Sequence, residues 1–497
     1  MEKYDICVIG AGPAGYAAAM RAIDFGKKVV LIDKNKVGGA GLYDGALSSK
    51  TLWELSKDVN HTKSRVGTFG INCDFNLDFS VVKKELDTAV NERANQLESH
   101  LAGLLEEGYK NVFFLKYGAA KLITKNEVEI KSDEGSEVIF ADNIIIATGS
   151  RPRKLAHIPI DENIIVTSDT IHQWDKLPKS LVILGAGVIG CEYATIYSNF
   201  GETKVKIIDK APRIIPFEDD DVSEMVTTQL EKNGVEIHHG AQLLRMEIID
   251  GEVEYEIDCG GTKSVHRVEK ALVSVGRIPN TEGLGLEKVG VKLTDRGSIW
   301  DDDTQTSVPN IYAIGDVTAD IALVNVGELE GRHAIKRIVG ESKGPLSYDN
   351  ICSIMFLKPI VAAVGMNEKQ CREKGISYQV VKLDYRAIPR AIAMRNPPGF
   401  FKILVTNDKE MKVLGMRVVG AQASTAIQAV GLLMYMNKGV EELAEMIHPH
   451  PSLIEGIQEC CRVLLGKSIF KPQVMKDYID YRGYMSDQFD SVTEYYS

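Results

Sequence analysis

The sequence YDICVIGAGPAG, residues 4–15, is a short apolar run that ends in glycines spaced as G-x-G-x-x-G. A second apolar run follows and ends in an acid, Asp33. Gly10 permits a tight turn, Gly12 lets a pyrophosphate approach the backbone, and Gly15 lets the next helix pack on the strand. The helix N-terminus then faces the phosphates, and the acid accepts hydrogen bonds from a ribose. This order of elements predicts a dinucleotide-binding unit at the start of the chain.

The same pattern occurs again in the middle of the chain. Gly185, Gly187 and Gly190 repeat the glycine spacing after an apolar run, and Asp209 ends the next one. An acid at this strand end favours the free ribose hydroxyls of NAD(H) and repels the 2′-phosphate of NADP(H). Arg213 follows closely and keeps NADP(H) as the less favoured alternative.

The remaining segments place these two units within a larger α/β protein. Residues 151–153, Arg-Pro-Arg, mark a domain crossing. Residues 311–316, IYAIGD, return to a buried strand, and alternating strands and helices begin near residue 348. We predict two nested Rossmann-like domains and a third α/β domain, with these boundaries: 1–151 and 276–346 for the first domain, 152–275 for the second, 347–467 for the third, and 468–497 for a Tyr- and Asp-rich tail that is weakly packed or disordered.

Composition and charge narrow the classes of partner. The net charge of −11 and the pI of about 5.5 argue against nucleic acid or an anionic membrane. No apolar run reaches the ~18 residues of a transmembrane helix, and no signal peptide is expected before the first strand, so a cytoplasmic location is predicted. The eight cysteines lack metal-site spacing, and we predict no metal. The acidic cluster at 218–221 is interpreted as a solvated helix start.

Several motifs together resemble the pyridine nucleotide-disulfide oxidoreductases. Beside the two nested units stand A-T-G at 147–149, G-D at 315–316 and HPHPSLIE at 448–455, in the family's order. The resemblance covers about residues 4–467 and is nearest the dihydrolipoamide dehydrogenase branch. It implies FAD on the first unit, NAD(P)H on the second, and a third domain that forms a homodimer.

The resemblance also implies roles for individual residues. Lys50 would lie near flavin N5 with Glu192 as its ion-pair partner, or the two form a plain structural salt bridge. His450 would be the acid/base, oriented by Glu455 and reaching the flavin of the other subunit, or the two are an inherited structural pair. The nucleotide-binding positions implied are Gly10, Gly12, Gly15, Asp33, Lys50, Gly118, Thr148, Gly149 and Asp316 for FAD, and Gly185, Gly187, Gly190, Asp209 and Gly276 for NAD(H).

One stretch departs from the family. Residues 38–50 read GGAGLYDGALSSK, where the family carries G-G-T-C-L-N-V-G-C-I-P-S-K with a redox disulfide against the flavin. Gly41 and Ala46 stand at the two cysteine positions. In the L-A-H-x-A segment, Asn325 stands at the histidine and Gly327 at the last alanine. Loss of both cysteines is expected to free volume on that flavin face, where a flat acceptor could stack.

These departures lead to three hypotheses about function. The first is an FAD-dependent NAD(P)H oxidoreductase that passes electrons from reduced flavin directly to a small, quinone-like acceptor, with His450 as proton donor. The second is NAD(P) transhydrogenation through the flavin, which also needs no disulfide. The third is an FAD- and NAD-binding electron-relay or sensor subunit within a complex.

Overall fold

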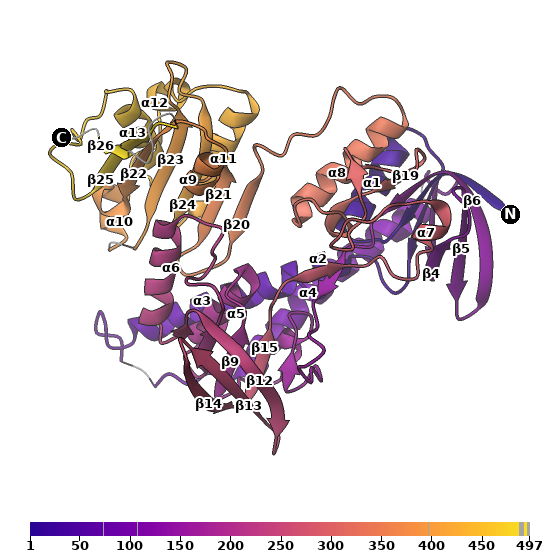
Figure 1. The fold of residues 1–497 in the computed structure, drawn as a ribbon, viewed down its shortest axis with the longest axis horizontal. Helices are drawn as coiled ribbons and strands as arrows, with labels where there is room; N and C mark the ends of the chain where they lie inside the picture. The colour runs from indigo at the N-terminus through magenta and orange to yellow at the C-terminus, as the bar shows by residue number, and fades with distance from the viewer. Residues whose placement is uncertain (73, 107, 396, 487–491, 495–497) are drawn as a thin grey trace.

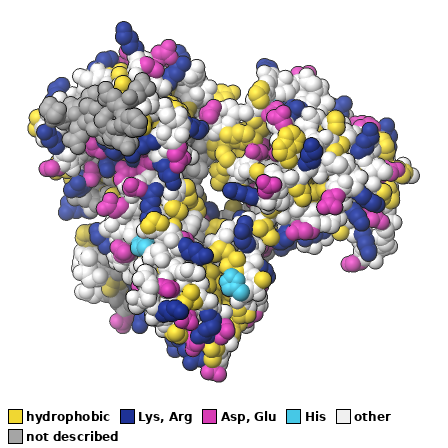
Figure 2. All heavy atoms as spheres, in the orientation of Figure 1, with side chains coloured by type: hydrophobic (Ala, Val, Ile, Leu, Met, Phe, Trp, Pro, Cys, Tyr) yellow, Lys and Arg dark blue, Asp and Glu magenta, His cyan; other side chains and the backbone are white. Residues whose placement is uncertain are grey.

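The chain folds into three lobes (Figure 1). The structure is a computed structural model and describes residues 1–72, 74–106, 108–395, 397–486 and 492–494. Within this described part of the chain, no helix is both long and apolar enough to cross a membrane. Side chains of both charges are scattered over the face seen in Figure 2, and neither sign dominates it.

The first lobe is built on a parallel sheet in the order β3, β2, β1, β6, β19. The central strand β1 buries Ile6 and Val8 completely. Helix α1 starts with Pro13, whose fixed φ suits the first helical position, and packs against α8. The main elements are β1 (Glu2–Ile9), α1 (Pro13–Asp24), β2 (Val29–Asp33), α2 (Gly39–Leu42), α3 (Ala46–Arg65), α4 (Phe79–Glu106), β3 (Phe113–Tyr117), β4 (Ala119–Leu122), β5 (Glu127–Ser132), β6 (Gly135–Ile146), β17 (Asp301–Asp302), β18 (Gln305–Thr306), β19 (Ile311–Ala313) and α8 (Val324–Ile338).

The second lobe is inserted in the chain between β6 and β17 of the first. Its five strands β11, β10, β9, β15 and β8 are parallel, and a three-stranded antiparallel sheet accompanies them. The chain enters and leaves through a short antiparallel pair, β7 (Ser150–Pro152) with β16 (Arg277–Pro279). The other elements are β8 (Ile165–Val166), β9 (Ser180–Leu184), α5 (Val188–Phe200), β10 (Lys204–Ile208), α6 (Asp220–Lys232), β11 (Glu236–His238), β12 (Ala241–Ile249), β13 (Glu252–Cys259), β14 (Thr262–Val268) and β15 (Lys270–Val273).

The third lobe is a seven-stranded antiparallel sheet in the order β20, β21, β24, β23, β22, β25, β26. Helix α11 packs on β21 and β24, and α13 packs on β22 and β23. The elements are β20 (Cys352–Met355), β21 (Val361–Gly365), α9 (Glu368–Glu373), β22 (Tyr378–Asp384), α10 (Pro389–Ala393), β23 (Phe400–Thr406), β24 (Val413–Val419), α11 (Ala423–Tyr435), α12 (Glu441–Glu445), α13 (Glu455–Leu464), β25 (Ile479–Tyr484) and β26 (Val492–Glu494).

The prediction of a weakly packed tail after residue 468 is wrong for β25. This strand pairs with β22 over six residue positions, and Ile479 is buried in the core of the third lobe. Arg482 on the same strand lies 2.8 Å from Glu368. Few aliphatic residues suffice here because the strand gains its hydrogen bonds from an existing sheet edge. Residues 487–491 and 495–497, also part of the predicted tail, lie outside the described residues.

The interpretation of residues 218–221 as a solvated helix start holds for Asp220, whose side chain is 94 % exposed at the first position of α6. It is wrong for Glu218, Asp219 and Asp221. Glu218 lies 2.8 Å from Arg417, and both side chains are buried. Lys402, only 1 % exposed, lies 2.8 Å from Asp219 and 3.0 Å from Asp221. These pairs join the start of α6 in the second lobe to the sheet of the third, so Glu218, Asp219 and Asp221 form a contact between lobes.

Lys402 is the centre of this contact. Besides Asp219 and Asp221 it meets Glu368 at 2.6 Å. Burial acts to lower the pKa of Lys402, but the three carboxylates outweigh it and raise that pKa. The lysine is therefore held as a cation in a site closed to water. We name the set of Lys402, Asp219, Asp221, Glu368 and Arg482 the Lys402 network.

Candidate functional site

The two glycine turns have nearly the same geometry. Gly12 caps α1 with φ −71° and ψ −179°, and Gly187 caps α5 with φ −74° and ψ −172°. Neither helix start has a side-chain cap, and a Cβ at either glycine would meet no atom within 4 Å. Free N–H groups above an open backbone suit a bound phosphate.

The flanking glycines are held by close packing. A Cβ at Gly15 would lie 1.9 Å from the carbonyl oxygen of Gly10, and a Cβ at Gly190 would lie 2.0 Å from that of Gly185. The helix therefore sits directly on its turn in both units. The predicted roles of these glycines in helix packing are consistent with this spacing.

The two strand-end acids are tied to their own turns. Asp33 accepts from the Ala11 N–H at 2.9 Å, and Asp209 accepts from the Ala186 N–H at 2.5 Å. Each carboxylate thus lies beside its glycine turn, where the ribose of a bound dinucleotide is expected. Gly118 donates its N–H to the Asp33 carbonyl at 2.8 Å, which places it at the same end of the sheet.

The A-T-G segment lies where the two lobes join. Thr148 donates to the Asn280 carbonyl at 2.7 Å, and Asn280 returns a bond to the Thr148 carbonyl at 2.9 Å. Gly149 has φ +68°, and Gly276 has φ +102° with open space at its Cβ position. Because these glycines have no side chains, the backbone is accessible where the chain crosses between the lobes.

Asp316 is the third carboxylate that the sequence predicts to bind a nucleotide. Ser150 donates to its Oδ2 at 2.7 Å, and Arg277 Nε donates to Ser150 Oγ at 2.8 Å. Arg277 was not among the predicted site residues, although it lies in the G-R-I-P-N segment that closes the second lobe. Its contacts cross from β16 to β7 and help to orient Asp316.

The stretch 38–50 forms α2 and the first turn of α3. Gly38 has φ +121° and donates its N–H to the Ala11 carbonyl, which anchors the stretch to the first glycine turn. A Cβ at Gly41 would lie 2.6 Å from Pro13 Cγ and 4.0 Å from Val324 Cγ2. The expectation of freed volume is therefore wrong along the Cβ direction of Gly41, because the Pro13 ring already occupies that space.

Lys50 and Glu192 form the predicted ion pair. Lys50 Nζ lies 3.0 Å from Glu192 Oε2, and it connects α3 of the first lobe to α5 of the second. The Glu192 side chain is 6 % exposed, whereas that of Lys50 is 33 % exposed. Protein therefore shields Glu192 from solvent, whereas solvent or a ligand can reach the Lys50 side chain.

His450 and Glu455 also form their predicted pair. His450 Nδ1 lies 2.8 Å from Glu455 Oε1, and Glu455 Oε2 accepts from the Ser452 N–H at 2.8 Å. Burial acts to raise the pKa of Glu455, but the Ser452 N–H and His450 outweigh it and lower that pKa. The ring of His450 is 69 % exposed at the surface of the third lobe. A carboxylate-oriented imidazole on an open surface can transfer a proton to a group outside its own lobe.

Sequence reasoning missed Phe356, which completes the surroundings of Lys50 and Glu192. Its N–H donates to Glu192 Oε1 at 2.9 Å. Phe356 comes from the loop between β20 and β21, so all three lobes meet at Glu192. No sequence pattern marks this residue, because a single phenylalanine in an apolar segment usually indicates core packing.

The chain is similar to known proteins over nearly its whole length. The model of the pyridine nucleotide-disulphide oxidoreductase family matches residues 4–331, and that of its dimerisation domain matches residues 351–461. A dihydrolipoyl dehydrogenase of Bacillus subtilis is 34% identical over 468 residues, which are 94% of this chain and 97% of the relative. LpdA of Mycobacterium tuberculosis superposes with a TM-score of 0.84 at 26% identity, covering 93% of this chain and 100% of that one. The Escherichia coli flavoprotein disulfide reductase RclA, solved as a Cu(II) complex, superposes with a TM-score of 0.82 at 28% identity over the same shares.

Proposed function

Because this chain belongs to the pyridine nucleotide-disulphide oxidoreductase family, we propose that it is a member without a redox disulfide. It takes electrons from NAD(P)H through FAD and passes them directly to a small, quinone-like acceptor. The family is one of flavin-dependent NAD(P)H oxidoreductases with a dimerisation domain. The acceptor and the route of the electrons are what the proposal adds.

One observation carries the proposal. The parts that would load electrons onto the flavin are present: two open glycine turns, two strand-end acids and the Lys50–Glu192 pair. The stretch from Gly38 to Lys50, which connects the first turn to that pair, contains no cysteine. Thiol–disulfide exchange needs a thiolate and a sulfur to attack. The electrons therefore leave by a route that needs no sulfur in this stretch.

The residues fit FAD on the first unit. Gly10, Gly12 and Gly15 would hold the pyrophosphate, Asp33 the adenosine ribose, and Asp316 the ribityl chain. When bound, FAD accepts a hydride and returns two electrons to an acceptor. The overall reaction balances as NAD(P)H, a proton and a quinone giving NAD(P)+ and a hydroquinone. His450 of one protomer, oriented by Glu455, would supply a proton to the reduced acceptor at the other protomer of a homodimer.

The surroundings of Arg213 support NAD(H) as the preferred coenzyme. Arg213 donates to the carbonyls of Pro216 at 3.1 Å and Glu218 at 2.7 Å, and it also pairs with Asp220. An arginine engaged in this way is not available to a 2′-phosphate. Asp209 remains as the group that selects for free ribose hydroxyls.

Anaerobic mixing with NADH followed by a panel of acceptors tests the proposal. The FAD-loaded protein is expected to bleach on mixing with NADH and to recover its colour with a quinone but not with lipoamide. Recovery with thio-NADP alone would replace the proposal with transhydrogenation. Rapid turnover of lipoamide would show that a disulfide route exists elsewhere in the chain and would overturn the proposal.

A further inference from the structure

The two oxygens of Glu192 have separate partners from two different lobes. Oε2 faces Lys50 Nζ of the first lobe at 3.0 Å, and Oε1 accepts the Phe356 N–H of the third lobe at 2.9 Å. Because the partners lie on different oxygens, they fix the rotation of the carboxylate as well as its position. The Phe356 N–H therefore leaves Oε2 of the buried carboxylate as the acceptor for Lys50.

The ring of Phe356 contacts the lysine itself. Lys50 Nζ lies 5.2 Å from the centroid of this ring, within the range of a cation–π attraction. The same ring meets Trp53 edge to face at 5.4 Å and 78°. Lys50 and Trp53 are three residues apart on α3 and so lie on one face of the helix. One side chain of the third lobe therefore holds two neighbouring positions of α3.

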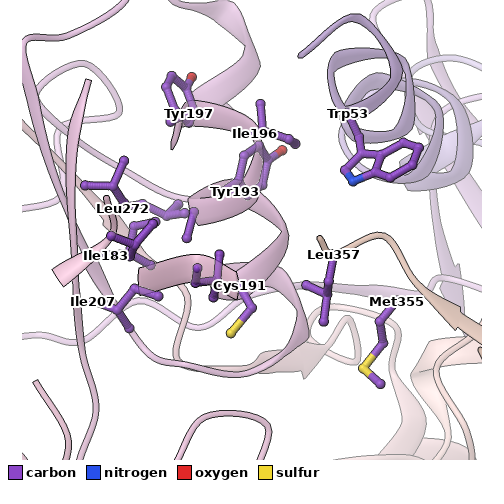
Figure 3. Packing of buried hydrophobic residues seen from close by; sticks show 14 of the residues in the cluster. Trp53, Ile183, Cys191, Tyr193, Ile196, Tyr197, Ile207, Leu272, Met355 and Leu357 are labelled. Carbon is purple, nitrogen blue, oxygen red and sulfur yellow. The ribbon is translucent and has the colours of Figure 1, made fainter. Parts of the chain in front are cut away.

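The segment around Phe356 is fixed on both sides. Met355 and Leu357 are buried against α5, opposite the sheet residues of the second lobe (Figure 3). Lys358 Nζ donates to Asn60 Oδ1 of α3 at 2.7 Å and to Asn233 Oδ1, just after α6, at 3.0 Å. The segment thus contacts both nucleotide-binding lobes, and Phe356 cannot shift independently of them.

We propose that Phe356 is a positioning residue for hydride transfer, because it holds the Lys50 ammonium in place against Glu192. The inference rests on the proposed role of Lys50 beside the flavin. Without the ring, the ammonium loses its cation–π contact and α3 loses a contact at Trp53. Lys50 then spends less time in the position set by Glu192. The third lobe thereby takes part in the chemistry of its own subunit.

The first test compares three variants of the FAD-loaded protein. In Phe356→Leu, the rate of flavin reduction at saturating NADH is expected to fall about fivefold, in line with the loss of one cation–π contact. Phe356→Tyr keeps the ring and restores the rate. Phe140→Leu is the matched control, because the half-buried Phe140 ring lies 5.3 Å from Lys3 Nζ in the first lobe. Its reduction rate is expected to equal that of the wild type.

The second test measures Lys50 without any turnover. Competitive acetylation with acetic anhydride, read by mass spectrometry, reports how freely the Lys50 amine reacts in the protein with and without FAD. Acetylation of Lys50 is expected to be about fivefold faster in Phe356→Leu and unchanged in Phe140→Leu. If Phe356→Leu does not fold, Phe356→Met keeps the volume without the ring and takes its place.

Two results would overturn the inference. One is an unchanged acetylation rate of Lys50 in Phe356→Leu, which means that the ring does not hold the amine. The other is faster acetylation with an unchanged rate of flavin reduction, which removes the link to hydride transfer. Both readouts are independent of the acceptor, so a failure of the quinone proposal would leave them intact.

Discussion

Two of the ionic contacts between the second lobe and its neighbours differ in how completely protein encloses them. In the Lys402 network, a lysine that is 1 % exposed has three carboxylates within 3.0 Å, and Arg482 adds a second cation at Glu368. In the other contact, Glu192 is buried but the Lys50 side chain is 33 % exposed. The first cluster sets three carboxylates against two cations, and protein encloses its central lysine. The second keeps its cation at an open edge.

This difference separates a structural role from a chemical one. A buried charge whose partners are all protein groups can contribute to holding lobes together, but no ligand can reach it. A lysine with an open side can meet a cofactor or substrate while its counter-ion stays fixed. The comparison therefore supports Lys50 as the residue that faces the flavin, and it gives the Lys402 network the role of joining lobes. The following predictions test this division.

Removing the central cation should have the largest effect on stability. Lys402→Met removes the cation that Asp219, Asp221 and Glu368 share, and Asp219 loses its cation partner. Losing one partner of a buried pair costs about 3–5 kcal/mol. We expect the free energy of unfolding in urea to fall by that amount. Lys412→Met, which removes an exposed lysine paired with Glu410, is the control and should leave the unfolding midpoint unchanged. Equal midpoints for the two variants would contradict the structural role.

Glu330 is a buried carboxyl whose hydrogen-bond partners are neutral groups, in contrast to the acids of the Lys402 network, which face cations. Burial raises its pKa to about 7, against the lowering effects of the Gly315 N–H and the Tyr348 hydroxyl. The folded protein thus holds a proton that the unfolded chain releases near its ordinary pKa of 4.5. The stabilisation is fully present below that value and is lost as pH rises through about 7, a loss of about 3 kcal/mol.

The variant that checks this is Glu330→Gln. Glutamine can accept from the Gly315 N–H and donate to Tyr348 without titrating. Urea unfolding between pH 5 and pH 8 should therefore show a smaller loss of stability with rising pH in the variant. Asp301, whose pKa burial raises to about 6, remains and accounts for a residual slope. Identical slopes for variant and wild type would show that Glu330 does not bind the extra proton.

The outer member of the Lys402 network should matter less than its centre. Arg482→Met removes one cation from Glu368, which keeps Lys402 as a partner. We expect a loss of about 1–2 kcal/mol in the free energy of unfolding, since a hydrogen bond to a charged group has about this value. Arg267→Met, at a more exposed pair with Asp250, is the matched control. A loss as large as that of Lys402→Met would mean that β25 as a whole had detached.

Lys50→Met should have the smallest effect on stability and a large effect on chemistry. Glu192 keeps the Phe356 N–H, and the lysine side of the pair is open, so we expect a loss of about 1 kcal/mol or less. Flavin reduction by NADH, followed by stopped flow, should slow at least about tenfold, as for other losses of an active-site charge interaction. A stable variant with an unchanged reduction rate would assign the pair to structure alone.

Local sequence patterns predicted most of the fold correctly. Gly10 and Gly15 mark a turn because the positive φ of Gly10 and the close packing at Gly15 require glycine. Asp33 follows at a spacing set by one helix and one strand. The same reasoning found the second unit and its insertion in the first, whereas the Lys50–Glu192 and His450–Glu455 pairs were predicted in another way. The pairs came from resemblance, since residues 50 and 192 have no spacing relation.

The errors arose where distant segments meet. The acids at 218–221 were interpreted as a solvated helix start, because a pattern of charges does not reveal whether another lobe covers the helix. The tail read as weakly packed because its few aliphatic residues gave no sign of a free sheet edge at β22. The space beside Gly41 seemed open because the position of Pro13 depends on how α1 and α2 pack.

The sequence by itself determined that two dinucleotide-binding units are nested and that the stretch 38–50 lacks cysteine. Those properties are encoded in residues close together in the chain. Only the tertiary structure decided that Lys402 is enclosed by acids from two lobes, that β25 extends the sheet of the third, and that Phe356 contacts Lys50. Apart from Lys402 with Glu368, these contacts join residues about a hundred or more positions apart, and only tertiary packing brings them together.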